Sequence, residues 1–372
     1  MPAFVRGLQL SALFYEDAVM PILATLLPSS AYAAALLGPG SEVLGYDTPL
    51  STDHDWGPRL LLFLAARHDP ADIQRIAQAL DQRLPPTFYG YPTRFTLTHD
   101  APGTPPRHHV TVQTVRAYVA AHLGLDPGTA WQPADWLSVP EQTLLELTAG
   151  AVYHDGPGEL TALRARLAFY PHELWLYLMA AQWHRIAQQE AFVGRAGDVG
   201  DELGSRLLAA APVRDLMRLC FLIERRYAPY SKWFGTAFAR LACGPALGPL
   251  FEQVLQAGEW HTREAALAAA YGAVVERHNG LALTAPMEAT VSPYYTRPYL
   301  VVHAGRVADA LRAAIADPAV RFLPAYGSID QVSDNTDLLG NVEARAWLRG
   351  LYTASAQGPR DRDTGTESTR RT

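Results

Sequence analysis

Cysteine is scarce in this sequence, and basic residues are fewer than acidic ones. Two cysteines, Cys220 and Cys243, stand among apolar neighbours without CxxC spacing, which argues against a disulfide framework or structural zinc and favours a reducing cytoplasm. The 31 lysines and arginines are outnumbered by 37 aspartates and glutamates, for a net charge of -6. The chain as a whole therefore does not attract nucleic acid or anionic lipid, and a polyanionic ligand would need a local basic site.

Long uncharged apolar runs are missing too, and no window reaches the length that a membrane span requires. Glu16 and Asp17 interrupt the apolar N-terminal run, which argues against a secretory signal. We find no internal repeat. The 49% hydrophobic content is ample for full cores, so we expect a folded, globular chain of more than one domain.

The first 135 residues mix helical and extended patterns and predict a small domain with a mixed sheet. Apolar spacing predicts a helix over residues 10–27, which Pro21 should kink or split in two. Residues 31–37 form an apolar run that fits either a helical piece or a short buried strand, and a glycine-rich turn follows it. Further elements are expected in this order: a strand over 52–64, a helix capped by Asp69, and strands over 94–99 and 109–115.

The character of the sequence changes after this region. Residues 136–285 carry long apolar segments at helical spacing and predict a helical domain. Residues 286–353 predict a small α/β appendage, and residues 354–372 lack core-forming side chains and predict a disordered tail. The expected class is therefore α+β.

Candidate chemistry concentrates in the early stretch GPGSEVLGYDTPLSTDHDWGPR, residues 38–59. On an extended segment Asp53 and Asp55 would point to one face, where two carboxylates repel unless a cation lies between them. Such oxygen ligands suit Mg²⁺, which shares the phosphates of a substrate. Ser41, on the preceding turn, offers a hydroxyl and backbone N–H groups to a phosphate. A solvated acidic turn is the alternative.

This spacing of Gly40-Ser41 and Asp-x-Asp resembles the DNA polymerase β-like nucleotidyltransferase superfamily, and the aminoglycoside-modifying (kanamycin nucleotidyltransferase) branch looks most similar. The chain also resembles a bacterial group of nucleotidyltransferase-like proteins of unknown function, marked by DHDWGPR and RYAPYSKW, here residues 53–59 and 226–233. In the superfamily the Gly-Ser turn follows a helix and begins the sheet.

The resemblance implies that residues 1–135 are a catalytic domain in which a hydroxyl attacks the α-phosphate of a nucleoside triphosphate and pyrophosphate leaves. We expect ATP to be this nucleotide. On this model Asp53 and Asp55 hold Mg²⁺, Gly40 and Ser41 contact the outer phosphates, and Arg59 neutralises developing charge. A third carboxylate is often found on a later strand of such proteins. Residues 110–115 offer only Thr111, Gln113 and Thr114 there.

The helical domain supplies a candidate base. Glu190 continues the apolar face of a helix predicted over 171–194, and a buried carboxylate can act as a general base. The aminoglycoside-modifying relatives use a glutamate from this domain, and pairing of Glu190 with Arg195 is the alternative. In the glycine-rich acidic loop expected over 194–205, Asp198 and Asp201, with Arg195, could bind the acceptor, or the aspartates could cap the next helix.

A local basic and aromatic cluster follows a helix predicted over 213–226. Its expected nucleotide-binding residues are Arg225, Arg226, Tyr230 and Lys232, because cations suit a triphosphate and an aromatic ring can stack on a base. The alternative is a solvated helix end whose cations complement the macrodipole.

These observations predict a cytoplasmic, Mg²⁺-dependent nucleotidyltransferase whose acceptor is a hydroxyl of a small molecule or protein. A nucleotide-binding regulatory protein without turnover is the second hypothesis, because of the missing carboxylate, and a structural partner-binding protein is the third. The lack of a large basic stripe argues against an RNA acceptor, and the absence of apolar spans argues against a membrane partner.

Overall fold

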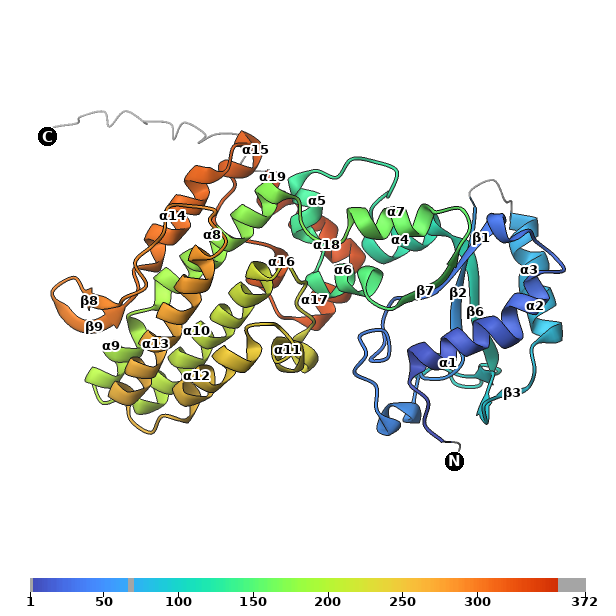
Figure 1. The fold of residues 1–372 in the computed structure, drawn as a ribbon, viewed down its shortest axis with the longest axis horizontal. Helices are drawn as coiled ribbons and strands as arrows, with labels where there is room; N and C mark the ends of the chain where they lie inside the picture. Colours follow the sequence, from blue (N-terminus) through green and yellow to red (C-terminus); the bar gives the residue numbers. More distant parts are fainter. Residues whose placement is uncertain (1–2, 66–69, 354–372) are drawn as a thin grey trace, which may run out of the picture. The chain divides into compact units, whose positions relative to one another are not determined.

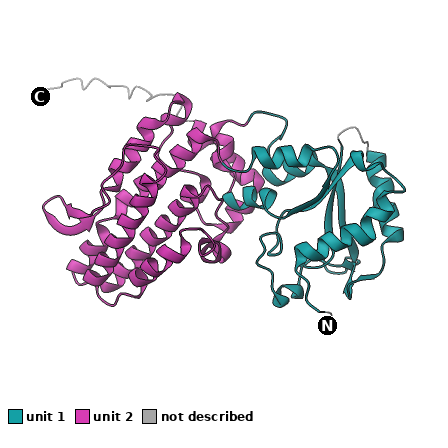
Figure 2. Cartoon of the chain, viewed as in Figure 1, with its two compact units in different colours: residues 1–130, 141–169 teal, residues 131–140, 170–372 magenta. Residues whose placement is uncertain are grey.

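The computed structural model describes residues 3–65 and 70–353. The chain divides into two compact units, which Figure 2 colours separately: unit 1 is residues 1–130 and 141–169, and unit 2 is residues 131–140 and 170–372. The expected α+β class is confirmed, because unit 1 contains a mixed sheet and unit 2 is mostly helical.

Two sequence predictions fall outside the described residues. They are the helix cap at Asp69 and the tail of residues 354–372. None of the helices in the described part of the chain has the length and apolarity needed to cross a membrane.

Unit 1 is built on a five-stranded sheet of order β5-β6-β2-β1-β7, in which only the β2–β6 pair is parallel. Its elements are α1 (Gly7–Leu13), η1 (Phe14–Val19), α2 (Met20–Leu23), η2 (Ser29–Ala31), β1 (Tyr32–Leu36), η3 (Pro49–Asp53), β2 (Arg59–Leu64), α3 (Pro70–Arg83), β3 (Thr87–Phe88), β4 (Tyr91–Pro92), β5 (Arg94–Phe95), β6 (Arg107–Thr114), α4 (Val115–Leu123), α6 (Glu141–Thr148), β7 (Ala151–Asp155) and α7 (Glu159–Arg166).

The ambiguous apolar run at residues 31–37 is the strand β1. All five of its residues are buried, because β2 and β7 pair with its two edges and helices cover both faces of the sheet. On one face, Leu10 and Phe14 pack with Ile76 and Leu80 of α3 in the main core. On the other face, Phe63 of β2 contacts Tyr118 of α4, with 5.4 Å between ring centroids.

The first helix is not split by its proline. It runs from α1 to α2 through the π-helical segment η1, where the Met20 N–H donates to the Tyr15 carbonyl, five residues back. A proline has no N–H and its ring clashes with the preceding turn. The wider π turn just before Pro21 lets the helix continue.

Unit 2 is a helical assembly that includes the C-terminal region. Its elements are α5 (Pro133–Ser138), α8 (His172–Gln189), α9 (Phe192–Asp198), α10 (Glu202–Ile223), α11 (Ser231–Phe238), α12 (Gly244–Gln256), α13 (Trp260–Asn279), β8 (Ser292–Tyr294), β9 (Arg297–Val301), α14 (Ala304–Ala314), α15 (Pro318–Arg321), α16 (Ile329–Val332), α17 (Thr336–Gly340), α18 (Val342–Leu348) and α19 (Gly350–Thr353).

The region expected to be a small appendage on either domain, residues 286–353, belongs to unit 2. The helix α14 packs along α8. The Tyr177 hydroxyl of α8 donates to the Pro324 carbonyl over 2.7 Å, and the Gln331 amide donates to Gln182 over 2.8 Å. Because buried polar groups pair across this contact, the two regions form one core.

Candidate functional site

Strand pairing brings three loops to one end of the sheet in unit 1: the turn after β1, the acidic loop before β2 and the loop before β6. The strand β1 ends at Leu36, just before the turn of residues 38–41, and its antiparallel partner β2 begins at Arg59, just after the acidic residues 53–55. The parallel strand β6 begins at the same end, with Arg59 opposite His109. The glycine-serine turn and the acidic loop therefore lie at the same sheet edge.

The turn at this edge has a backbone that requires glycine. Gly38 and Gly40 have φ values of 93° and 142°, in the region that other residues rarely adopt. A Cβ at Gly40 would lie 2.6 Å from Oε2 of Glu42 and 2.8 Å from Nη2 of Arg59. The N–H of Tyr46 donates to the carbonyl of Ser41 over 2.8 Å, so the backbone folds back directly after the turn.

Arg59, expected to neutralise charge on a nucleotide, lies largely inside unit 1. Its Nη2 atom pairs with Glu42, which is 4% exposed, and donates to the carbonyl of Pro39 over 3.3 Å. Burial lowers the pKa of Arg59 to about 10, so the guanidinium stays charged at neutral pH. The partners of its guanidinium are thus Pro39 in the turn and Glu42 directly after it.

The acidic loop does not have the extended backbone that the sequence predicts. Asp53 ends the 3₁₀ helix η3, Asp55 has a φ of 51°, and β2 begins only at Arg59. The expected strand over 52–64 is therefore wrong for residues 52–58. Pro58 cannot donate to a sheet ladder, and Gly57, with a φ of 155°, packs against Phe95. Because residues 53–55 are not a strand, strand alternation does not place the two aspartate side chains on one face.

Both carboxylates of this loop have hydrogen-bonding partners of their own. The Thr98 N–H donates to Oδ1 of Asp55 over 2.7 Å, and the Thr98 hydroxyl donates to Oδ2. Partial burial opposes ionisation of Asp55, but these hydrogen bonds, with His54 and His99 nearby, lower its pKa. Asp53 pairs with Nδ1 of His54 over 2.7 Å, and its side chain is 56% exposed.

These carboxylates suit Mg²⁺ in chemical type. Among residues 3–65 and 70–353, no three His, Cys, Asp or Glu side chains are grouped to hold a metal ion. Mg²⁺ is commonly bound by one or two carboxylates together with water and substrate phosphates. Hydrogen bonds from neighbours, like those of Thr98 to Asp55, typically orient such ligands. Two aspartates in an accessible loop therefore fit a Mg²⁺ ion that arrives with a phosphate ligand.

The strand β6, which pairs with β2 in parallel, carries no carboxylate. Thr111 lies opposite Leu61 and Gln113 lies opposite Phe63 in the parallel register, and the sequence of β6 is RHHVTVQT. The third carboxylate that the superfamily often has is therefore missing from this strand, as its sequence indicates.

Glu190 of unit 2 is buried, as its position on an apolar helix face predicts, with 6% of its surface exposed. It accepts the backbone N–H groups of Val302 and Ala304 over 3.1 and 3.3 Å. Burial raises its pKa to about 7, against these hydrogen bonds and the charge of Arg306. Its carboxylate therefore joins the end of α8 to the start of α14.

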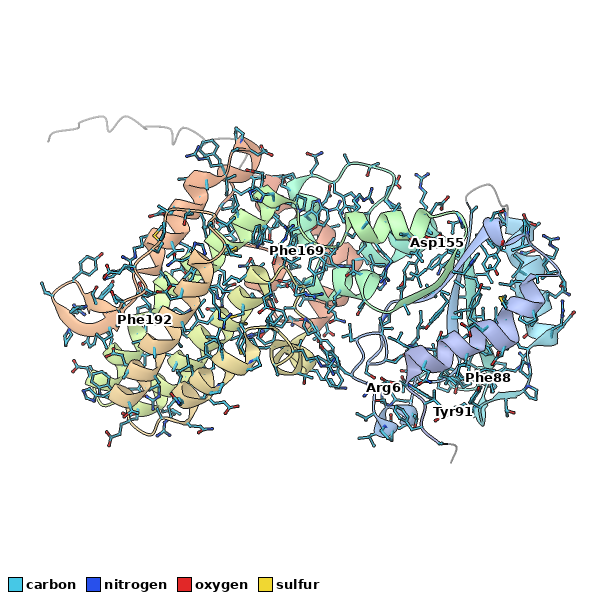
Figure 3. All side chains as sticks on the ribbon, in the orientation of Figure 1. Arg6, Phe88, Tyr91, Asp155, Phe169 and Phe192 are labelled. Carbon is cyan, nitrogen blue, oxygen red and sulfur yellow. The ribbon has the colours of Figure 1, made fainter. Side chains whose placement is uncertain are left out.

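Arg195 lies 5.5 Å from the ring centroid of Phe192, not at Glu190. Phe192, labelled in Figure 3, begins α9 with 38% of its surface exposed. The contacts of Glu190 with the N–H groups of Val302 and Ala304 therefore differ from both sequence alternatives, a general base and an ion pair with Arg195.

The segment of residues 194–205, expected to be a glycine-rich loop, is largely helical. Its glycines are explained by close contacts with neighbouring side chains. The segment forms α9 and the start of α10. A Cβ at Gly197 would overlap the Trp260 side chain, and one at Gly194 would overlap Glu264. Asp201 caps α10 by accepting the Gly204 N–H over 2.7 Å, so the capping alternative is confirmed for it.

Asp198, the other acidic candidate of that segment, accepts the Tyr299 hydroxyl over 3.0 Å. This contact joins α9 to β9 within unit 2. Both aspartates therefore make contacts that stabilise the fold of unit 2.

The basic and aromatic cluster lies between α10 and α11. Arg225, Arg226, Tyr230 and Lys232 are exposed, while residues 227–229 between them are buried. The Arg225 guanidinium lies 5.0 Å from the Trp175 ring centroid, and the Lys232 ammonium lies 5.0 Å from that of Trp233. Lys232 is also the only lysine in the sequence. The buried residues anchor a surface segment rich in exposed cations.

Three residues at the sheet edge were not found from the sequence: Glu42, Asp47 and Thr98. Glu42 directly follows Ser41, so its position beside a candidate turn was the available signal. Asp47 accepts the Gly7 N–H over 2.6 Å and Thr98 contacts Asp55. Those contacts join residues about 40 positions apart, which single-sequence spacing does not reveal.

Comparison with family models gives one match. Residues 136–234 are similar to the family described as Domain of unknown function (DUF4037). The match includes the RYAPYSKW segment of unit 2 and none of the three loops at the sheet edge of unit 1. Neither the curated proteins nor the solved structures gave a match.

Proposed function

We propose that the protein is a nucleotidyltransferase that binds a nucleoside triphosphate with Mg²⁺ at the sheet edge of unit 1. The observation that carries this proposal is the β1–β2 pairing, which brings the turn of residues 38–41 and the loop of residues 53–55 to one end of the sheet. The turn offers the backbone N–H groups of Gly40 and Ser41 to phosphate oxygens, and the loop offers carboxylates to a cation.

In the proposed reaction, a hydroxyl of an acceptor attacks the α-phosphate, and the bond to the leaving pyrophosphate breaks. Mg²⁺ bound with the nucleotide would neutralise phosphate charge. Asp53 and Asp55 would hold this ion, and Gly40 and Ser41 would hold the outer phosphates. The acceptor is a small molecule or a protein, the first nucleotide to test is ATP, and the cytoplasm is the compartment we propose.

Arg59 takes a different part from the one that the sequence indicates. Its guanidinium pairs with Glu42 and the Pro39 carbonyl, so in this proposal it supports the turn. The exposed cations Arg225, Arg226 and Lys232 supply a second anion-attracting surface within unit 2.

Transfer from ATP labelled at the α-phosphate tests the proposal. Wild-type protein with Mg²⁺ and a panel of hydroxyl acceptors should transfer label and release pyrophosphate. The double variant Asp53→Asn/Asp55→Asn should lose both, with its fold checked by circular dichroism. The variant Glu16→Gln/Asp17→Asn, which changes two adjacent exposed carboxylates of η1, should keep them. Full transfer by the aspartate variant would exclude the assigned metal ligands.

A second candidate function is nucleotide binding without turnover. The sequence of β6 lacks a carboxylate, and Glu190 is occupied by backbone N–H groups, so no identified group acts as a base. This function predicts Mg²⁺-dependent binding of ATP with no label transferred to any acceptor.

A further inference from the structure

The carboxylate of Glu42 is buried directly beneath the turn of residues 38–41. Only 4% of Glu42 is exposed, and its side chain pairs with Arg59, which also reaches the Pro39 carbonyl. The space between Gly40 and this pair has no room for a Cβ. The turn therefore rests on a largely buried ion pair.

The first helix holds the same segment from another direction. A Cβ at Gly7 would lie 2.5 Å from Cβ of Glu42, so the start of α1 packs directly on that side chain. The Gly7 N–H donates to Asp47 over 2.6 Å, at the far end of the segment that begins at Glu42. Residues 42 and 47 are thus both fixed to the first residue of α1.

A buried ion pair is an expensive way to stabilise a fold, because desolvation of both charges opposes their attraction, and apolar replacements are often as stable. Its geometry, by contrast, is directional. The Arg59 guanidinium presents fixed donors in a plane, and here Nη2 serves both Glu42 and a carbonyl of the turn. The pair therefore fixes a backbone conformation.

We propose that Glu42 is a positioning residue for phosphate binding. With Arg59 and Gly7 it holds the turn in the conformation that presents the backbone N–H groups of Gly40 and Ser41 to the outer phosphates, while the Gly38 N–H donates to the Glu146 carbonyl over 2.9 Å. This inference rests on the proposed function, since it names the residue that prepares that site. Glu42 acts through the turn and does not contact the nucleotide.

Hydrogen exchange of the ligand-free protein tests the positioning. In Glu42→Gln, which keeps the shape and removes the charge, amides of residues 38–46 should exchange faster than in wild type, while those of β1 and β2 keep their rates. Arg59→Lys, which keeps a charge but loses the planar fork, should act in the same direction. The control Glu264→Gln removes a similarly buried carboxylate, 8% exposed, from unit 2, and should leave this segment unchanged.

Calorimetry with ATP and Mg²⁺ tests the consequence. Glu42→Gln should weaken binding by about tenfold or more, the scale of supporting residues around a ligand site, and Glu264→Gln should not. Unchanged exchange at residues 38–46 in both variants would overturn the positioning role, as would faster exchange with unchanged affinity. Wild-type protein that fails to bind ATP with Mg²⁺ would instead contradict the proposed function, and with it the phosphate part of this inference.

Discussion

Thr98 orients the carboxylate of Asp55 and lowers its pKa, because the Thr98 N–H and hydroxyl both donate to it. Thr98→Val removes the hydroxyl bond and should raise the pKa of Asp55. Mg²⁺ should then bind about tenfold more weakly, as when partners of metal ligands are removed. The measurement is the Mg²⁺ concentration that gives half of the thermal stabilisation by ATP.

Thr98→Ser is the matched control, because it keeps the hydroxyl and loses only a methyl group. It should retain the Mg²⁺ dependence of wild type. Equal Mg²⁺ dependence in the valine and serine variants would show that Thr98 does not prepare Asp55.

At the residue scale, functional groups that lie near one another in the sequence could be predicted to form one site. Groups that come together only through folding could not. Ser41, Asp53 and Asp55 lie within 15 positions, and their spacing predicted one site at a turn. Glu42 and Thr98 support those groups through contacts that depend on the sheet. The shared strand face expected for the two aspartates was wrong, because Gly57 and Pro58 delay the start of β2 to Arg59.

At the element scale, the contact of Glu190 with the start of α14 makes the stability of unit 2 depend on pH. Its pKa is raised from the usual value to about 7 by burial, so folding favours the protonated form. This stabilisation is fully present below the ordinary glutamate pKa and is lost as the pH rises through 7. The groups around it are Arg306, which favours the charged form, and Tyr271, a buried phenol.

Glu190→Gln should remove this dependence, because its amide oxygen accepts the same N–H groups without a proton equilibrium. From about pH 5.5 to about pH 8.5, wild type should lose about 2 kcal/mol more stability than the variant. Denaturant unfolding at the two pH values measures the difference. Parallel pH profiles would mean that Glu190 does not titrate in this range.

Strongly periodic elements could be predicted, whereas short or irregular ones could not. The apolar face of Ile76 and Leu80 predicted α3 correctly. The strand β7, with all five residues only partly buried, has no strict alternation and was missed. The segment at residues 194–205 was expected to be a loop because of its glycines. Close packing of Gly197 on Trp260 explains them instead, and tertiary contact outweighs helix propensity there.

At the scale of the whole molecule, the change in apolar spacing along the sequence predicts an α/β part and a helical part. It does not predict the residues at which the two units begin and end. Residues 141–169 return to unit 1, where β7 pairs with β1. Residues 286–353 join unit 2 through Tyr177 and Gln331. Both differences between the predicted and the observed boundaries come from contacts between segments that are distant in the sequence. Local composition does not indicate such contacts.

The most direct test of the central claim is thermal unfolding with ATP, with and without Mg²⁺, in wild type and in Asp53→Asn/Asp55→Asn. Binding to the folded state raises the unfolding temperature as ligand concentration exceeds the dissociation constant. Wild type should be stabilised by ATP only when Mg²⁺ is present, and the double variant should not be stabilised under either condition. Equal stabilisation of the two proteins, or none of wild type by any nucleoside triphosphate with Mg²⁺, would contradict a metal-nucleotide site at this sheet edge.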